Sequence, residues 1–282
     1  MDNCRNPGRT RSWATVALAA VLASAAPAAE ASLTAYTFAG ANLVRFQNGP
    51  VDVTLTADGN LLGTLLAGSA NPAALIGSII AASGGSIADA GYGTWTLTAS
   101  DFGGDGSVNY FGARAFINYL NSTNYGGTNQ WRLPGITDTG AAGCDFAFAG
   151  TDCGYNVAPG SGELARLYYS ELGRTAAFDT TGSPTTGFGI FANDGAQTPA
   201  GAVGPFTNVR SDVYWAGLDY GPAPQAGWVF ATFDGVQGFE GKEEKRYAWA
   251  VTPGQVVPVP AALWLFGSAL AGLAGLRRAR SA

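Results

Sequence analysis

The chain has 282 residues, of which 15 are Lys or Arg, 20 are Asp or Glu and none is His. The missing histidine excludes histidine acid-base catalysis, the Ser-His-Asp and Cys-His nucleophile systems and every imidazole metal site. With 47% hydrophobic and 12% charged residues the chain is too apolar to be disordered, and its 41 glycines, which follow no three-residue period, predict a turn-rich globular fold.

The N-terminus has the three parts of a secretory signal peptide. Arg5, Arg9 and Arg11 precede an apolar stretch over 13–26, which small residues follow. Because this stretch is too short to span a membrane, we expect residues 1–31 to direct export and then to be removed. A buried N-terminal helix is the alternative.

The segment that follows predicts an α+β fold, with a β-rich N-terminal part over 32–104. Strands are indicated by β-forming residues between turn signals, and helices by 3.6-residue periodicity and capping residues. The last three predicted strands form an aromatic-rich antiparallel set. In chain order we expect strands at 33–38, 43–46, 51–56 and 92–97, helices at 73–82, 110–120 and 164–172, and strands at 213–218, 228–233 and 247–252.

Two cysteines remain after the signal peptide, Cys144 and Cys153. Outside the cytoplasm, an isolated pair eight residues apart predicts a disulfide that closes a small loop. A catalytic thiol would have no histidine to activate it, and a metal site would have no further Cys or His ligand.

Several aromatic residues in the second half of the chain predict either core packing or stacking on a sugar, with core packing favoured. Arg132, beside a tryptophan, is expected to pair with Asp138, Asp212 or Glu163 in preference to a ligand, because a buried guanidinium needs a carboxylate. The candidate residues are Trp131, Arg132, Tyr214, Trp215, Trp228 and Trp249.

Two polar clusters have simpler interpretations as turns or loops. Asp101, Asp105 and Asn109 are the candidate Ca²⁺ ligands, but their spacing does not match an EF-hand, and a Gly-Asp turn is the favoured interpretation. Lys242 and its basic neighbours alternate with glutamates, which predicts a solvated loop. We therefore expect no metal and no cofactor.

The tail, residues 255–282, has a proline-bearing motif, 16 uncharged residues over 261–276 and a basic end. The uncharged run predicts a transmembrane helix, and the basic end stays cytoplasmic by the positive-inside rule, so the preceding chain lies outside the inner membrane. The motif and the basic end consist of Val257, Pro258, Val259, Pro260, Arg277, Arg278 and Arg280.

This tail resembles the PEP-CTERM sorting signal of Gram-negative bacteria, with Val259 where that family usually has Glu. The resemblance implies a precursor anchored in the inner membrane, cleavage by an exosortase-type enzyme, and release to the cell surface or to the extracellular matrix of a biofilm. A plain C-terminal anchor is the alternative.

Both ends carry much of the positive charge. Without them the chain keeps nine basic and 18 acidic residues, a net charge near −9. Such a surface does not attract nucleic acid, and an acidic polysaccharide would need a local basic site or bridging cations.

A series of motifs over residues 105–254 resembles the Lcl C-terminal domain family, in its subgroup with PEP-CTERM tails. The resemblance implies a C-type-lectin-like fold with a twisted antiparallel sheet and two helices. Tyr-Trp-Ala-Gly stands where the family usually has Tyr-Trp-Ser, and the calcium signature Glu-Pro-Asn of lectins is missing from the sequence, so the fold alone does not imply sugar binding. The motifs are the helix 113–120, Trp131-Arg132-Leu133-Pro134, Gly150 to Asn156, Tyr214-Trp215-Ala216-Gly217 and Ala248 to Gly254.

The sequence favours an exported, non-catalytic surface or matrix protein that interacts with extracellular polysaccharide. One alternative is an extracytoplasmic enzyme, either a glycosidase with two carboxylates or a relative of the formylglycine-generating enzymes, whose Arg-Leu-Pro element is similar to residues 132–134. The other alternative is a purely structural surface protein. No residue is singled out as catalytic.

Overall fold

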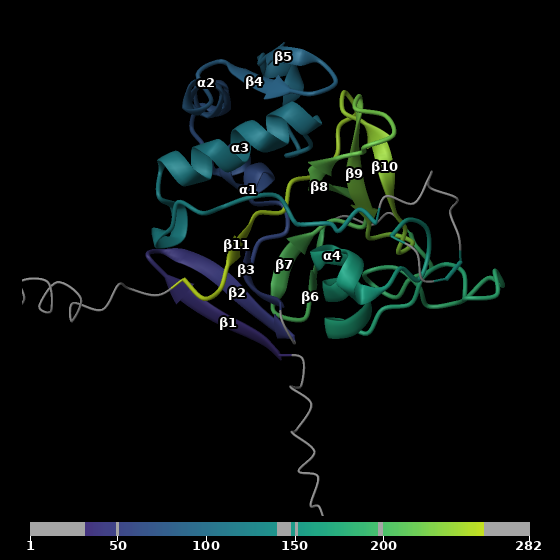
Figure 1. Ribbon diagram of the computed structural model, residues 1–282. Helices are drawn as coiled ribbons and strands as arrows, with labels where there is room; N and C mark the ends of the chain where they lie inside the picture. The colour runs from purple at the N-terminus through teal and green to yellow at the C-terminus, as the bar shows by residue number, and fades with distance from the viewer. Residues whose placement is uncertain (1–31, 49–50, 140–147, 150–151, 197–199, 257–282) are drawn as a thin grey trace, which may run out of the picture. The chain divides into compact units, whose positions relative to one another are not determined.

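The computed structural model describes residues 32–48, 51–139, 148–149, 152–196 and 200–256 (Figure 1). All of them belong to one unit, Ala31–Ala282, which is a mixed fold of α-helices and antiparallel sheets. The predicted signal peptide, the sorting tail with its membrane segment 261–276, and Cys144 lie outside the described residues. Within the described ranges, no helix combines the length and the apolar character needed to cross a membrane.

The described elements alternate between short strands and short helices. The helices are α1 (Leu61–Gly68), α2 (Pro72–Ala82), α3 (Tyr110–Ser122) and α4 (Glu163–Arg166), which continues into a π-helical turn at Leu167–Glu171. The strands are β1 (Ser32–Phe38), β2 (Ala41–Asn48), β3 (Val51–Thr56), β4 (Ser86–Asp89), β5 (Gly93–Thr96), β6 (Gly201–Val203), β7 (Phe206–Val209), β8 (Val213–Asp219), β9 (Ala226–Ala231), β10 (Gln237–Gly241) and β11 (Val251–Pro253).

The first sheet has the order β1-β2-β3-β11 and brings together the two ends of the described chain. Val251 in β11 lies opposite Leu55 in β3, and the Trp249 indole nitrogen donates a hydrogen bond of 2.9 Å to the carbonyl oxygen of Thr56. These contacts join the predicted N-terminal part, 32–104, to the predicted domain 105–254 within one unit.

The second sheet has the order β10-β9-β8, and two-stranded sheets are formed by β4 with β5 and by β6 with β7. The prediction that 247–252 is the third strand of the aromatic set is therefore wrong, because β10 takes that place. The segment instead crosses between the sheets: the Tyr247 amide donates to the Val213 carbonyl oxygen of β8, and only β11 at its end is a strand, paired with β3.

The segment 105–254 contains the two expected α-helices, α3 and α4, but its described strands belong to three sheets. The described residues form four α-helices and four sheets. Helix α1 is not among the expected elements, because its short apolar run begins only a few residues after β3 and contains no charged residue. Its start is marked by Asn60, whose side-chain oxygen accepts a hydrogen bond from the amide of Gly63.

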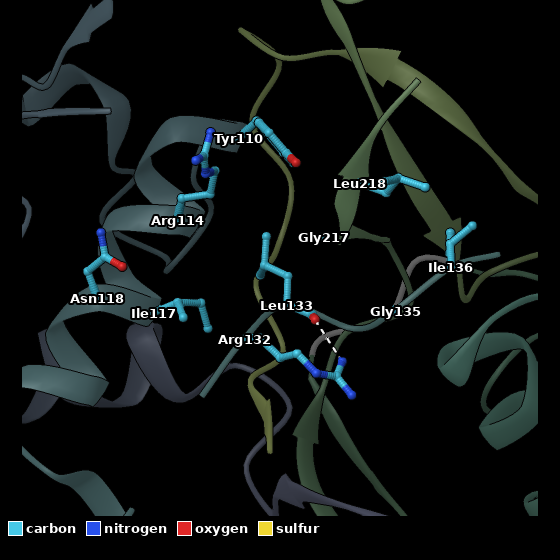
Figure 2. A pocket seen from close by; sticks show the side chains of 10 residues that line it. All are labelled: Tyr110, Arg114, Ile117, Asn118, Arg132, Leu133, Gly135, Ile136, Gly217 and Leu218. Carbon is cyan, nitrogen blue, oxygen red and sulfur yellow. Dashed lines mark hydrogen bonds between the residues drawn. The ribbon is translucent and has the colours of Figure 1, made fainter. Parts of the chain in front are cut away.

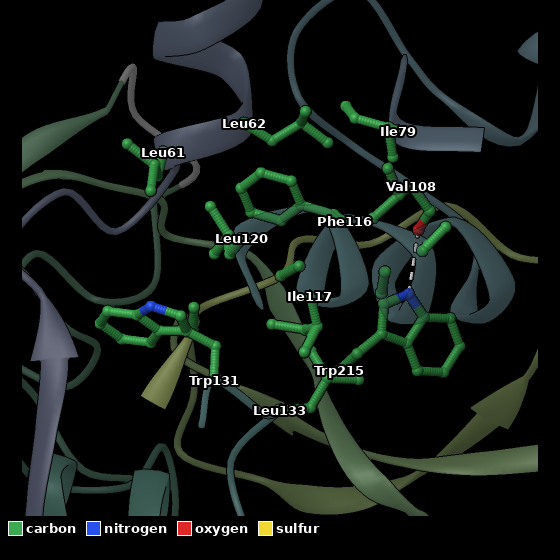
Figure 3. Packing of buried hydrophobic residues seen from close by; sticks show 14 of the residues in the cluster. Leu61, Leu62, Ile79, Val108, Phe116, Ile117, Leu120, Trp131, Leu133 and Trp215 are labelled. Carbon is green, nitrogen blue, oxygen red and sulfur yellow. Dashed lines mark hydrogen bonds between the residues drawn. The ribbon is translucent and has the colours of Figure 1, made fainter. Parts of the chain in front are cut away.

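Helix α3 is the centre of the larger core. Its apolar face, including Phe116 and Leu120, packs against Leu62 of α1 and Ile79 of α2, and the indole of Trp215 from β8 covers its other side (Figure 3). Its N-cap, Asn109, is buried: the side-chain oxygen accepts from the Gly112 amide at 2.8 Å, and the side-chain nitrogen donates to Asp101 at 2.8 Å.

Replacing this cap gives a first test of the fold. We expect Asn109→Ala to lower the free energy of unfolding by about 2 kcal/mol, because it removes the cap and leaves a donor of Gly112 unpaired. The matched change Asn71→Ala removes an exposed cap of α2 and should cost less. Urea unfolding of both variants checks this order, and equal losses would contradict it.

Candidate functional site

A pocket of about 350 Å³ lies between α3, the segment 132–136 and β8 (Figure 2). We call it the α3–β8 pocket. Its volume falls within the range of small-molecule sites. The pocket is lined by Tyr110, Arg114, Ile117, Asn118, Arg132, Leu133, Gly135, Ile136, Gly217 and Leu218.

One wall of the pocket comes from a single face of α3. Tyr110, Arg114 and Asn118 follow one another at intervals of four residues, so their side chains line up along the helix. Figure 2 shows them beside Ile117 on the wall opposite Leu218. The pocket therefore has a polar stripe facing an aliphatic side.

The floor of the pocket is the extended segment 132–136, which backbone hydrogen bonds fix at three places. The Arg132 amide donates to Val251 of β11 at 2.8 Å, and the Gly217 amide of β8 donates to Pro134 at 2.8 Å. The Glu163 amide, at the start of α4, donates to Gly135 at 3.0 Å. The floor is therefore held by both main sheets and by α4.

The Arg132 side chain is positioned by a bidentate ion pair with Glu163. Its Nη1 lies 2.7 Å from Glu163 Oε2 and its Nη2 lies 2.6 Å from Oε1. Glu163 Oε2 also accepts from the Gly135 amide at 2.7 Å. Of the three carboxylates expected from the sequence, Glu163 is thus the partner, and it ties the guanidinium and the floor together.

At the other end of the pocket, Arg114 and Tyr110 lie close together. Arg114 Nη1 donates to the Ala88 carbonyl oxygen at 3.0 Å and lies 3.6 Å from the Asp89 carboxylate. Burial raises the pKa of the Tyr110 hydroxyl, and the negative charge of Asp219 raises it further, so this hydroxyl stays protonated and remains a donor.

The α3–β8 pocket is rich in hydrogen-bond donors and has no carboxylate among its lining residues. Two other pockets in the described part of the chain each contain one: Asp58 in a pocket of about 490 Å³ beside Tyr36 and Tyr125, and Glu163 in one of about 210 Å³. The Asp58 carboxylate accepts hydrogen bonds from the Asn60 amide, Thr64 and Asn208.

The structure separates the six candidates of the sequence into two groups. Arg132 lines the α3–β8 pocket. The other five are buried in the core. Among them, the Trp215 ring contacts Tyr110, and the Tyr214 ring contacts the Trp249 indole. Those five are Trp131, Tyr214, Trp215, Trp228 and Trp249.

Most residues that line the pocket could not be predicted from the sequence. Arg114 and Asn118 had a local signal, because they interrupt the apolar face of a predicted helix at i and i+4. Gly217 and Leu218 had none, since their approach to the floor depends on strand pairing far along the chain.

The candidate Ca²⁺ ligands do not converge on one point. Asp101 accepts from Trp95, Thr98 and Asn109, whereas the Asp105 side chain accepts from Ser107 and Tyr247. Among the described residues, no group of three or more His, Cys, Asp or Glu could hold a metal ion.

Two further predicted features concern single residues. Cys153 is buried and disulfide-bonded, while its predicted partner Cys144 lies outside the described residues. The predicted solvated loop is wrong for Lys242, which is fully buried. Its ammonium group pairs with carboxylates of β4 and β8, far away in the sequence, and these ion pairs offset part of the free-energy cost of burying the charge.

Asp234, after β9, is the one carboxyl of the described residues whose pKa rises strongly, to about 6, because burial penalises its charge. In the unfolded chain its pKa is near the ordinary aspartate value of 3.8, so the folded state holds the proton more tightly. The stability that this group contributes is complete below pH 3.8 and is lost as the pH rises through 6.

We therefore expect Asp234→Asn to raise the free energy of unfolding by about 1–3 kcal/mol at pH 7 and to change it little at pH 4. The amide stays neutral and keeps an acceptor for the Val236 amide. Urea unfolding at both pH values measures this difference. Asp179→Asn is the control, because hydrogen bonds lower the pKa of that exposed carboxyl; a gain at pH 7 in both variants would refute the assignment.

Comparison of the chain with family models, with curated proteins and with solved structures finds no match. The resemblance to the Lcl C-terminal domain and the lectin-like topology therefore stay predictions, while the mixed α+β architecture is established by the fold.

Proposed function

We propose that this protein is an exported, non-catalytic surface or matrix protein that binds extracellular polysaccharide in the α3–β8 pocket. One observation carries the proposal: Arg114, Asn118 and Arg132, whose side chains donate hydrogen bonds, line the pocket together with the aliphatic Leu133, Ile136 and Leu218. Sugars present the complementary surface, with apolar C–H faces and a rim of oxygen acceptors. Export and sorting by an exosortase-type enzyme rest on the two ends of the sequence.

The two arginines supply hydrogen-bond donors on an otherwise acidic surface. Each guanidinium has five N–H donors, and the described contacts of Arg114 use one of them in a hydrogen bond to Ala88. Donors therefore remain for a ligand oxygen. Because Arg132 is paired with Glu163 and Arg114 lies 3.6 Å from Asp89, the pocket offers hydrogen-bond donors but no excess of positive charge.

The alternative, a carboxylate-based glycosidase, needs two carboxyl groups that face one another across a cleft. The α3–β8 pocket has no carboxylate among its lining residues, which supports binding over hydrolysis at this site. A purely structural protein would bind no polysaccharide, which the following experiment detects.

The test measures retention of the protein on immobilised polysaccharide from the producing bacterium. We expect Leu218→Asp, which places a charge on the aliphatic side of the pocket, to abolish retention. Asn118→Ala should weaken binding about tenfold, because one hydrogen bond to the sugar is lost.

Asn42→Ala is the matched control, since Asn42 is also an exposed asparagine but lines the pocket that contains Asp58. It should bind like the wild type. The proposed site would be refuted if the wild type were not retained, or if only Asn42→Ala lost retention. Release of shortened sugars would indicate an enzyme.

A further inference from the structure

A buried cluster behind the α3 wall of the pocket joins Lys242 to two carboxylates. The Lys242 Nζ lies 2.7 Å from Asp89 Oδ2 and 2.9 Å from Asp219 Oδ1. The side chains of Lys242 and Asp89 are 0% exposed, and that of Asp219 is 35% exposed. Burying such charges costs free energy that ion pairing offsets only in part.

We propose that Lys242 and Asp89 condense into an intramolecular isopeptide bond, and that Asp219 carries the proton between them. The amine already contacts the carboxyl group, so the reaction needs no encounter step. Water is excluded from both side chains, which disfavours hydrolysis of the product. The product is a neutral amide, so two of the buried charges disappear. This proposal is independent of the proposed function.

The surroundings of Asp89 favour attack on its carboxyl carbon. Asp89 Oδ1 accepts hydrogen bonds from the amides of Gly91 at 2.9 Å and Tyr92 at 3.2 Å. These two donors are placed to stabilise the negative charge that develops on Oδ1 when nitrogen adds to the carbon. The other oxygen, Oδ2, faces Lys242 and Arg114 and is the one that leaves.

The reaction balances without any further reagent. Lys242 gives one ammonium proton to Asp219, and its free electron pair forms the C–N bond with Asp89. The C–Oδ2 bond then breaks, and Oδ2 leaves as water with two of the three ammonium protons, one of them returned by Asp219. The third proton stays on the amide nitrogen, and Asp219 is again a carboxylate.

The geometry also distinguishes the two carboxylates. Asp219 is partly exposed and hydrogen-bonded to Tyr110, so water can reach any bond formed there. The Asp89 side chain is fully buried, and the centre of the Tyr110 ring lies 5.2 Å from the Lys242 nitrogen. Asp89 is therefore the residue that is joined, and Asp219 is the proton carrier.

Peptide mapping of the reduced full chain tests the proposal directly. Trypsin should fail to cut after Lys242, so that the peptide 211–245 stays joined to the peptide 46–114, which contains Asp89. The joined species should be about 18 Da lighter than the two peptides together, because one water is lost. Complete cleavage after Lys242, with both peptides at their unmodified masses, would overturn the proposal. Loss of water within 211–245 alone would do the same, because it would place the bond at Asp219.

Variants test the role of Asp219. Asp219→Asn should lower the fraction of joined peptide at least about tenfold, because the proton carrier is missing. The control is Lys245→Met, which changes the only other lysine and should leave the joined peptide at the wild-type level.

Near-UV circular dichroism establishes that each variant is folded. A folded Asp219→Asn variant that joins its peptides at the wild-type level would overturn the role of Asp219. If Asp219→Asn does not fold, the wild-type map still decides whether the bond exists.

Discussion

Trp215→Ala is expected to lower the free energy of unfolding by about 3–5 kcal/mol, one of the two largest effects that we anticipate. Trp215 is fully buried, its ring lies 5.3 Å from that of Tyr110, and its indole nitrogen donates to the Val108 carbonyl oxygen at 2.9 Å. Removing the ring leaves a cavity between α3 and β8, because both elements are fixed by other contacts. Urea unfolding measures the loss.

Trp215→Phe is the graded control for this prediction. It keeps an aromatic ring in the core and removes the donor to Val108, so the loss should be about 1–2 kcal/mol. If Trp215 instead served to stack on a ligand, Trp215→Ala would leave stability nearly unchanged and would weaken only binding. That outcome would contradict the placement of this residue in the core.

Glu163→Ala is expected to affect both stability and binding. The change leaves Arg132 without its carboxylate and the Gly135 amide without its acceptor. We expect a loss of about 2–3 kcal/mol, below the value for a fully buried pair because Arg132 is partly exposed. Since the floor of the pocket is then less well fixed, affinity for the polysaccharide should fall at least about tenfold.

Glu163→Gln separates the two contributions. Its amide oxygen can still accept from Gly135, while the charge opposite Arg132 is lost. Stability and affinity should therefore lie between those of the wild type and Glu163→Ala. Unfolding and retention measurements on the same preparations check this order. Wild-type affinity in Glu163→Ala would show that the ion pair does not organise the site.

Local signals in the sequence predicted much of the secondary structure. The strands near 33–38 and 51–56 and the helices near 73–82 and 110–120 all occur, because strand composition and asparagine caps act over a few residues. The sheet order could not be predicted in the same way. Whether β11 pairs with β3 or with β9 depends on long-range packing that no local pattern records.

The candidate site was predicted only in part, for a similar reason. The sequence predicts that Arg132 needs a carboxylate, but the choice of Glu163 depends on how α4 docks onto the floor of the pocket. The burial of Lys242 could not be predicted, because its neighbours in the sequence are charged, whereas its partners, Asp89 and Asp219, lie on two distant strands. Burial of a charged residue is thus a property of the fold and not of its sequence neighbours.

The most direct test of the account is amide hydrogen exchange of the protein with and without the polysaccharide of its producer. Binding in the α3–β8 pocket predicts slower exchange in peptides that cover 110–118 and 132–136, with little change elsewhere. No change in either peptide, or protection confined to the pocket around Asp58 and Tyr125, would contradict the claim that this pocket is the polysaccharide site.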